Sequence, residues 1–409
     1  MIVQPKLTVC VPSRNRQRYF QETIRSLLVS MRTDVEYIFA DNSDDPVPMQ
    51  DFIQDIIGDP RVTFIPPADK VLSMVDNWER CMEKATGEFV CFIGDDDYVD
   101  VDVVDLINRT QAQESVVDVF VWSRLTYNWP LARPKPGNVR VPLGTSVHKI
   151  PRYDIYRTFF SWAQHSSSTP NCPFAIYHSA VSKRSMDKVK QKFGGRYFEH
   201  PVVDFENSCK LLVTAEHFFY SERSFSVMGA CPESNSASIW TIEKIKESHQ
   251  RFMTELGRNM DNDDYMKDFP FPSVLGLAAC IAQCQHWFRT TYGYKEIEGW
   301  EKNFADACAH NCGMMHDREA YEIVVSGYEE AFRQWKGGKF MADFKPKYIE
   351  RNPDVKIYFG IEGGSLYMDE AIAGARTPAD IYSIVNQVLV PAQELKLEFI
   401  NPNAVSRYA

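Results

Sequence analysis

Residues 77–99 read NWERCMEKATGEFVCFIGDDDYV. Apolar residues recur at helical spacing over residues 72–85, Gly87 follows as a helix cap, and residues 88–93 predict a buried β-strand. Three consecutive aspartates, Asp95, Asp96 and Asp97, come directly after that strand. A helix followed by a strand that ends in polar side chains is typical of open α/β sheets, in which ligands bind beyond the carboxyl ends of the strands.

The chain before this stretch repeats the pattern. Strands are predicted at residues 7–11, 35–40 and 62–65, and helices at 19–31 and 49–57. Strands that alternate with helices at this spacing predict an α/β fold with a mostly parallel sheet flanked by helices. Because polar clusters follow three of the strands, we expect those clusters to meet in one site.

The later part of the chain has a different pattern of predicted helices and strands. A helix at residues 102–113 and a strand at 117–122 precede a Pro-rich connection, residues 130–151, which predicts a loop, a hairpin or both. Long helices are predicted at 242–258, 274–290, 299–311 and 318–336. We therefore expect an α/β domain over residues 1–240 and a mainly helical domain over 241–409. The place of the strand-like residues 356–361 and of a helix near 378–390 stays open.

Composition narrows the class of protein. With 44% hydrophobic residues the chain can bury a large core, and a net charge of -10 argues against a protein built to grip nucleic-acid backbones. No secretory signal is recognisable, and the longest apolar run, residues 269–282, contains two prolines and is shorter than the ~20 residues of a membrane span. We expect a cytoplasmic protein without a transmembrane segment.

Ten cysteines in such a chain are expected to be reduced thiols. Two pairs, Cys280 with Cys284 and Cys308 with Cys312, have the spacing that places both thiols on one helix face. They indicate either a zinc site shared by two helices or, as the more common arrangement, cysteines packed at a helix contact.

Three segments in this order, LTVCVPSRNR (7–16), FADNSDD (39–45) and residues 77–99, resemble the family 2 glycosyltransferases, whose fold is called GT-A. A weaker resemblance extends to about residue 236. The family resemblance implies that residues 1–240 form a nucleotide-sugar-binding catalytic domain. This domain would be an inverting transferase that moves a sugar from a nucleoside-diphosphate donor, most often a UDP-sugar, with Mn²⁺ or Mg²⁺ as cofactor.

The resemblance also implies roles for individual residues on the donor side. The loop Pro12, Ser13, Arg14 and Asn15 would wrap the nucleobase and ribose, and Asp41 would accept a hydrogen bond from the base edge. Asp95 would lie near the ribose hydroxyls, Asp96 would bind the metal, and Asp97 would either bind it as a secondary ligand or support the ligands without touching the metal. Gly94 stands where many members have their first Asp, which leaves this division of roles open. Lys70 and Ser73 would favour the pyrophosphate.

The acceptor side requires a general base that takes the hydroxyl proton. Asp204, before the helix-like residues 205–213, is the implied base, with Glu206 and Glu199 as alternatives; an ordinary N-cap role for Asp204 is equally open. His178, beside Tyr177, either orients the donor or is a structural histidine. Ser234, Asn235 and Ser236 either close over the diphosphate or belong to an interdomain linker.

Two other functions fit parts of the sequence. A sugar nucleotidyltransferase shares the layered sheet and metal carboxylates, but it needs a Gly-rich loop after the first strand, where VPSRNR has no Gly. A catalytically silent binding or scaffold protein is the other alternative. The acceptor stays open among a glycan, a lipid-linked sugar, a protein, a small metabolite and a modified nucleobase. The helical domain at 241–409 is expected to serve either acceptor recognition or formation of a homo-oligomer.

Overall fold

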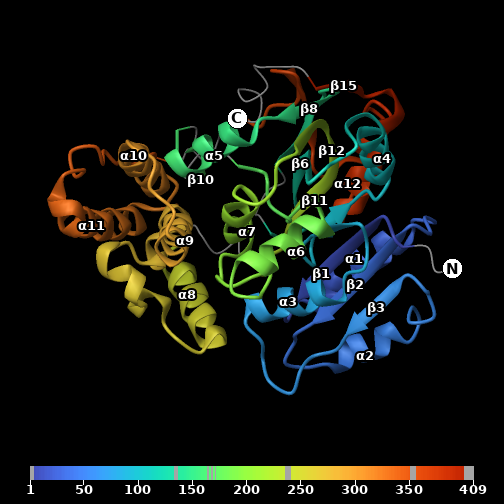
Figure 1. The fold of residues 1–409 in the computed structure, drawn as a ribbon, viewed down its shortest axis with the longest axis horizontal. Coiled ribbons are helices and arrows are strands. Elements are labelled where there is room, and N and C mark those ends of the chain that lie inside the picture. The colour runs from blue at the N-terminus through green and yellow to red at the C-terminus, as the bar shows by residue number, and fades with distance from the viewer. Residues whose placement is uncertain are drawn as a thin grey trace.

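The computed structural model describes residues 4–132, 137–163, 165–166, 169–170, 172–234, 241–350 and 356–399. A large lobe is built around a sheet, and a smaller helical lobe stands beside it (Figure 1). The first part of the sheet lobe contains β1 (Leu7–Ser13), α1 (Gln17–Leu28), β2 (Val35–Asp41), α2 (Val47–Ile53), β3 (Val62–Ile65), α3 (Met74–Lys84), β4 (Phe89–Phe92), β5 (Tyr98–Val99) and α4 (Val103–Glu114).

The middle of the chain completes most of this lobe. Its elements are β6 (Val119–Asn128), β7 (Asn138–Pro142), β8 (Ser146–Ile150), α5 (Arg152–Ser161), β9 (His165–Ser166), β10 (Thr169–Pro170), β11 (Ser179–Ser182), α6 (Lys183–Lys192), α7 (Val203–Leu211) and β12 (Phe218–Ala230). The helical lobe is formed by α8 (Ile242–Leu256), α9 (Leu277–Tyr292), α10 (Trp300–Gly313) and α11 (Arg318–Gln334).

Ten strands of the described chain form the main sheet, including β15 (Lys396–Glu398) near the end of the chain. Their order is β15-β8-β12-β6-β11-β4-β1-β2-β3, with β5 paired to β12. β1 pairs in parallel with β2 and β4, and β2 with β3, whereas β11 runs antiparallel between β4 and β6. The predicted class, an α/β fold with a mostly parallel sheet flanked by helices, is confirmed.

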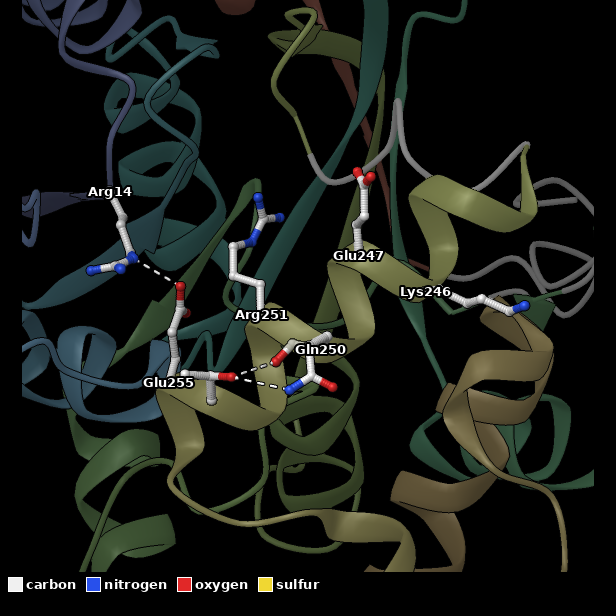
Figure 2. Close-up of a pocket in the computed structure, with 7 residues that line it drawn as sticks. Arg14, Lys246, Glu247, Gln250, Arg251 and Glu255 are labelled. Carbon is white, nitrogen blue, oxygen red and sulfur yellow. Dashed lines mark hydrogen bonds and ion pairs between the residues drawn. The ribbon is translucent and has the colours of Figure 1, made fainter.

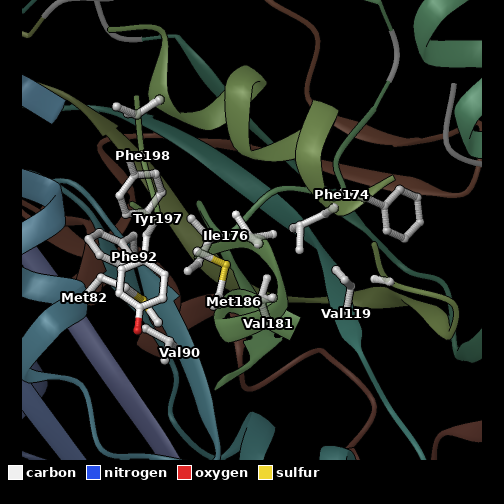
Figure 3. Close-up of a cluster of buried hydrophobic side chains, with 14 of the residues drawn as sticks. Met82, Val90, Phe92, Val119, Phe174, Ile176, Val181, Met186, Tyr197 and Phe198 are labelled. Atoms are coloured by element: carbon white, nitrogen blue, oxygen red, sulfur yellow. The ribbon is translucent and has the colours of Figure 1, made fainter. Parts of the chain in front are cut away.

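Both faces of the central strands are covered. All residues of β1 and β4 are buried, as expected for parallel strands between two layers of helices. On one face, Phe92 of β4 stacks on Trp78 of α3 with ring centroids 4.5 Å apart. Figure 3 shows this cluster continuing through Met186 of α6 and Phe198. The buried strands β1 and β4 are therefore held in place by the side chains that pack against them.

Gly87 has a different role from the predicted helix cap. Helix α3 ends earlier, with Ala85 at its C-cap position. A Cβ added at Gly87 would lie 2.6 Å from the Thr8 hydroxyl and 2.8 Å from the Thr8 backbone nitrogen. Glycine is required here because the chain passes close to β1 as it enters β4.

The Pro-rich connection does not form a hairpin between its own two strands. β7 pairs antiparallel with β14 (Ser365–Asp369), which also pairs with β13 (Gly360–Glu362), and β8 pairs with β12 and β15 (Lys396–Glu398). Helix α12 (Pro378–Val385) lies near β12, where the Tyr382 hydroxyl donates to Asp100 Oδ2 at 2.7 Å. The predicted helical domain at 241–409 is thus divided, because residues 360–398 return to the sheet lobe.

The helical lobe has its own core. Phe271, Phe304 and Trp335 pack together there, and Trp162 reaches in from the end of α5 and donates to Gln285 Oε1 at 2.9 Å. Among the described helices, none has the length and apolar character needed to cross a membrane. The paired cysteines are free thiols within or beside this core: Cys284 Sγ lies 3.9 Å from the Val202 carbonyl, and Cys280 Sγ lies 3.3 Å from the Ser273 carbonyl.

Asp118, which is buried before β6, provides a test of how the sheet lobe is held together. Its carboxylate accepts hydrogen bonds from the Glu216 and His217 amides at 3.0 and 3.1 Å and from Arg184 Nη2 at 2.6 Å. Asp118→Ala leaves two amides without an acceptor, and we expect the free energy of unfolding to fall by about 3 kcal/mol in urea denaturation. Asp264→Ala, at an exposed position, is the control and should leave it unchanged. Equal stability of the two variants would contradict this role for Asp118.

Candidate active site

The carboxyl ends of β1, β2 and β4 meet at one edge of the sheet. Ser13 and Asp41, the last residues of β1 and β2, are register partners. The Ser13 hydroxyl donates to Asp95 Oδ2 at 2.6 Å, and the Asn42 amide donates to the Ser13 carbonyl at 2.9 Å. The expected meeting of the polar clusters is confirmed, although Pro12 and Ser13 lie in the strand and not in the loop.

Asp97 is held by four donors. Its Oδ2 accepts from the Gly94 amide at 2.6 Å, the Tyr177 hydroxyl at 2.6 Å and His178 Nε2 at 2.9 Å, and its Oδ1 accepts from the Gly229 amide at 2.7 Å. Burial opposes ionisation, but His178 and the other donors outweigh it and lower the pKa of Asp97. Oδ2 thus receives three donors and Oδ1 one, and the role of Asp97 as a secondary metal ligand stays a prediction.

Asp95 and Asp96 face a single cation. Arg16 Nη2 lies 2.7 Å from Asp95 Oδ1, and Arg16 Nη1 lies 3.6 Å from Asp96 Oδ1. The other oxygen of Asp96, Oδ2, accepts from the Cys231 amide at 3.0 Å. Burial raises the pKa of Asp95 to about 7 and raises that of Asp96 as well, while Arg16 opposes both shifts.

Asp96, the predicted metal ligand, and Asp95, which the resemblance places near the ribose hydroxyls, are the residues that could hold a divalent metal. Asp95 Oδ1 is buried and accepts no hydrogen bond in the described structure, and carboxylate oxygens are the ligands that Mg²⁺ and Mn²⁺ prefer. Within the described ranges, no group of three or more His, Cys, Asp or Glu side chains is arranged to hold a metal ion. Asp95 and Asp96 fit a cation whose remaining ligands come from phosphate oxygens and water.

Asp41 presents an acceptor without a donor. The side chain is fully buried, and its Oδ1 accepts from the Ser43 amide at 3.0 Å. Its Oδ2 is buried and has no hydrogen-bond partner among the described residues. Burial raises the pKa of Asp41. Since buried acceptors are nearly always paired, Asp41 Oδ2 is a position where a ligand N–H group fits.

The loop after β1 is joined to the loop after β2. Asn15 adopts a left-handed backbone conformation with φ of 55°, its amide donates to Ser43 Oγ at 2.9 Å, and its side chain exchanges hydrogen bonds with Asp44. On the next loop, Ser73 caps α3 by accepting from the Asp76 amide at 3.2 Å, and Lys70 is exposed. Contacts of Lys70 and Ser73 with a pyrophosphate remain predictions.

The end of β12 closes the site from the other side. A Cβ added at Gly229 would lie 1.7 Å from the Asp96 carbonyl oxygen, which also accepts from Trp129 Nε1 at 2.8 Å. Only glycine allows β12 to approach so closely the loop of Gly94, Asp95, Asp96 and Asp97 after β4, which we call the acidic loop. Ser234 is buried, and its amide donates to the Cys231 carbonyl at 3.0 Å. Asn235 and Ser236 lie outside the described residues.

Asp204 lies in the first turn of α7, where Val202 and not Asp204 is the N-cap. Burial raises the pKa of Asp204, and its Oδ1 accepts from the Phe205 amide at 2.9 Å. Asn207, one turn later, accepts from the Ile176 amide at 2.9 Å. Because Tyr177 follows Ile176 and donates to Asp97, α7 is anchored to the segment that supports the acidic loop.

The alternative bases are engaged elsewhere. Lys210 is fully buried and forms ion pairs with Glu206 and, at 2.7 Å, with Glu199. The Tyr292 hydroxyl also donates to Glu199 at 2.5 Å. Because this network connects α7 to α9, Glu199 and Glu206 serve to hold the helix that carries Asp204.

The helical lobe reaches the loop after β1 through α8. A cavity of about 630 Å³ lies between Arg14 and this helix, lined on the α8 side by Lys246, Glu247, Gln250, Arg251, Thr254 and Glu255 (Figure 2). Arg14 Nε donates to Glu255 Oε1 at 2.8 Å, and Arg14 Nη1 donates to the Asn42 carbonyl at 3.0 Å. Helix α8 therefore helps to fix the loop after β1.

The sequence model of the family described as "Glycosyl transferase family 2" matches residues 8–188. These residues include the strand ends of β1, β2 and β4 and the acidic loop. Residues 8–188 are a family 2 glycosyltransferase domain. Comparison with curated protein sequences finds no match.

Solved structures with a distant likeness cover most of the chain that contains this family 2 domain. S. aureus TarS 1-349 in complex with UDP-GlcNAc is 14% identical, with 83% of this chain and 89% of TarS 1-349 covered and a TM-score of 0.45. The mannosyltransferase PcManGT from Pyrobaculum calidifontis, in complex with GDP-Man and Mn²⁺, is 14% identical, with 84% and 85% covered and a TM-score of 0.39.

Several residues that shape the family 2 domain were not assigned a role from the sequence. Arg16, Trp129 and Gly229 contact the acidic loop, through an ion pair, a hydrogen bond and a close backbone approach, respectively. Glu255 accepts a hydrogen bond from Arg14. Arg16 carried the one available signal, a cation just beyond β1 that could balance the aspartates after β4. For His178, the structural alternative agrees with its hydrogen bond to Asp97.

Gly229→Ala tests the support of the acidic loop. Because the added methyl group overlaps the Asp96 carbonyl, we expect the loop to shift and the affinity for UDP with Mn²⁺ to fall at least tenfold in calorimetry. Gly58→Ala is the control, since a Cβ there meets no atom within 4 Å. An affinity of Gly229→Ala equal to that of the parent protein would show that the close contact does not position the site.

Proposed function

We propose that this chain transfers a sugar from a UDP-sugar to an acceptor hydroxyl with inversion at the sugar carbon, assisted by Mn²⁺ or Mg²⁺. The observation that carries the proposal is the joint placement of Asp41 Oδ2, which has no described partner, and of Asp95 and Asp96 at adjoining strand ends. A nucleoside diphosphate has the matching groups, a base at one end and a polyanion at the other.

Asp41 supports a choice of nucleobase. Its buried Oδ2 is an acceptor and therefore requires a donor. Uracil offers its ring N3–H, and guanine offers N1–H, whereas the corresponding ring nitrogens of cytosine and adenine carry no hydrogen. Uridine is therefore favoured over cytidine and adenosine, because the latter two would leave Asp41 facing another acceptor.

Asp95 and Asp96 support metal assistance. A divalent cation held between their oxygens and the diphosphate would stabilise the negative charge that develops on the departing UDP. The Ser13 hydroxyl and the Cys231 amide each fix the second oxygen of one carboxylate. These two donors leave one Oδ1 atom of each aspartate directed at the cation position.

Asp204 supports the acceptor half of the reaction. The acceptor oxygen forms a bond to the sugar carbon as that carbon's bond to the diphosphate oxygen breaks, and Asp204 takes the acceptor's proton. Burial raises the pKa of Asp204, which makes its carboxylate a stronger base than an exposed aspartate. Its attachment through Asn207 and Ile176 keeps this carboxyl in a fixed relation to the acidic loop.

A nucleotide panel tests the donor assignment. We expect UDP and UDP-hexoses to bind at micromolar concentration in calorimetry with Mn²⁺, and to bind at least tenfold more weakly in EDTA. CDP and ADP should bind more weakly than UDP under both conditions. Absence of binding by every nucleotide to folded protein would reject the transferase and favour a scaffold role.

Asp204→Asn tests the base. The carboxamide keeps the shape of the side chain and cannot take the proton, so kcat should fall by about 10²- to 10⁴-fold while the Kd for UDP stays within twofold. Glu199→Gln changes a neighbouring carboxylate that is engaged with Lys210 and should lower kcat far less. A near-parental kcat in Asp204→Asn would assign the base elsewhere.

A further inference from the structure

The cation between Asp95 and Asp96 belongs to the protein itself. Arg16 precedes α1 at its N-cap position, and its side chain is only 19% exposed. Its two terminal nitrogens lie 2.7 Å from Asp95 Oδ1 and 3.6 Å from Asp96 Oδ1. In the described part of the chain, no other basic nitrogen lies within 4.0 Å of either carboxylate.

Charge balance explains this arrangement. Two adjacent buried carboxylates repel each other and lose hydration, which costs several kcal/mol per ion when no cation compensates for it. Asp97 does not share the guanidinium, because its four donors include His178 and two backbone amides. Arg16 therefore compensates the remaining pair and lets the acidic loop fold without a metal.

The oxygens that face Arg16 are the ones that a metal would require. Asp95 Oδ2 is occupied by the Ser13 hydroxyl, and Asp96 Oδ2 by the Cys231 amide. Only the Oδ1 atoms remain, and both are directed at the guanidinium. A divalent cation bound to these two atoms would take the place of the Arg16 nitrogens that now lie 2.7 and 3.6 Å from them.

We propose that Arg16 is a built-in counter-cation that competes with the divalent metal for Asp95 and Asp96, so that the metal binds weakly until a nucleotide diphosphate accompanies it. The inference rests on the proposed metal-assisted function and adds the condition that the metal binds tightly only together with the nucleotide. The diphosphate contributes further oxygen ligands to the metal and an anionic partner for the displaced guanidinium. Arg16 thereby couples metal binding to donor binding.

Arg16→Gln tests the competition in the absence of nucleotide. We expect Mn²⁺ to bind this variant at least tenfold more tightly than it binds the parent protein in calorimetry, because the competing cation is gone. In EDTA the melting temperature should be lower than that of the parent, and Mn²⁺ should raise it by more. Arg16→Lys keeps a positive charge and should remain within threefold of the parent affinity.

Arg18→Gln is the matched control, because Arg18 is an exposed residue of α1, and it should match the parent in both measurements. Unchanged or weaker Mn²⁺ binding by Arg16→Gln, or an unchanged melting temperature in EDTA, would overturn the proposal. If Arg16→Gln does not fold in EDTA, the charge-balanced double variant Arg16→Gln with Asp96→Asn should fold, and its failure would also overturn it. Since no nucleotide is present, these results are separate from failure of UDP binding by the parent, which would reject the proposed function.

Discussion

The structure of the site depends on how one short loop buries three neighbouring carboxylates. Three parts of the chain compensate these carboxylates. The segment around His178 and the end of β12 compensate Asp97, the Cys231 amide just after β12 and Arg16 compensate Asp96, and Ser13 and Arg16 compensate Asp95. The acidic loop can keep its conformation only while these segments stay in register. The compensation of buried charge therefore determines where β1, β11 and β12 end relative to one another.

The repeating first part of the fold could be predicted because its signals are local. Apolar runs followed by polar clusters located β1, β2, β3 and β4 to within a few residues, and parallel strands necessarily bring their carboxyl ends to one edge. This reasoning placed Asp41, Asp95 and Asp96 together. It did not separate their roles from that of Asp97, because the donors to Asp97 come from residues about 80 and 130 positions away.

Contacts between distant segments account for what the sequence left open. The partner of β7 is β14, more than 200 residues later, so the Pro-rich segment contained no signal that excluded a hairpin. Gly87 looked like a helix cap because caps are its commonest local use, whereas its reason is the nearby backbone of Thr8. The ion pair between Arg14 and Glu255 joins residues 241 positions apart and has no counterpart in local sequence.

The return of the chain after the helical lobe has a consequence for how this protein is divided. The polypeptide leaves the main sheet at the end of β12 and rejoins it through β15, while β14 pairs with β7. Helices α8 to α11 are therefore an insertion within the sheet lobe. A protein shortened at residue 240 would lose α12 and with it the Asn386 side chain, which accepts a 2.6 Å hydrogen bond from Arg223 of β12. The sheet lobe is therefore discontinuous in sequence, and its last strands are made only after the helical lobe.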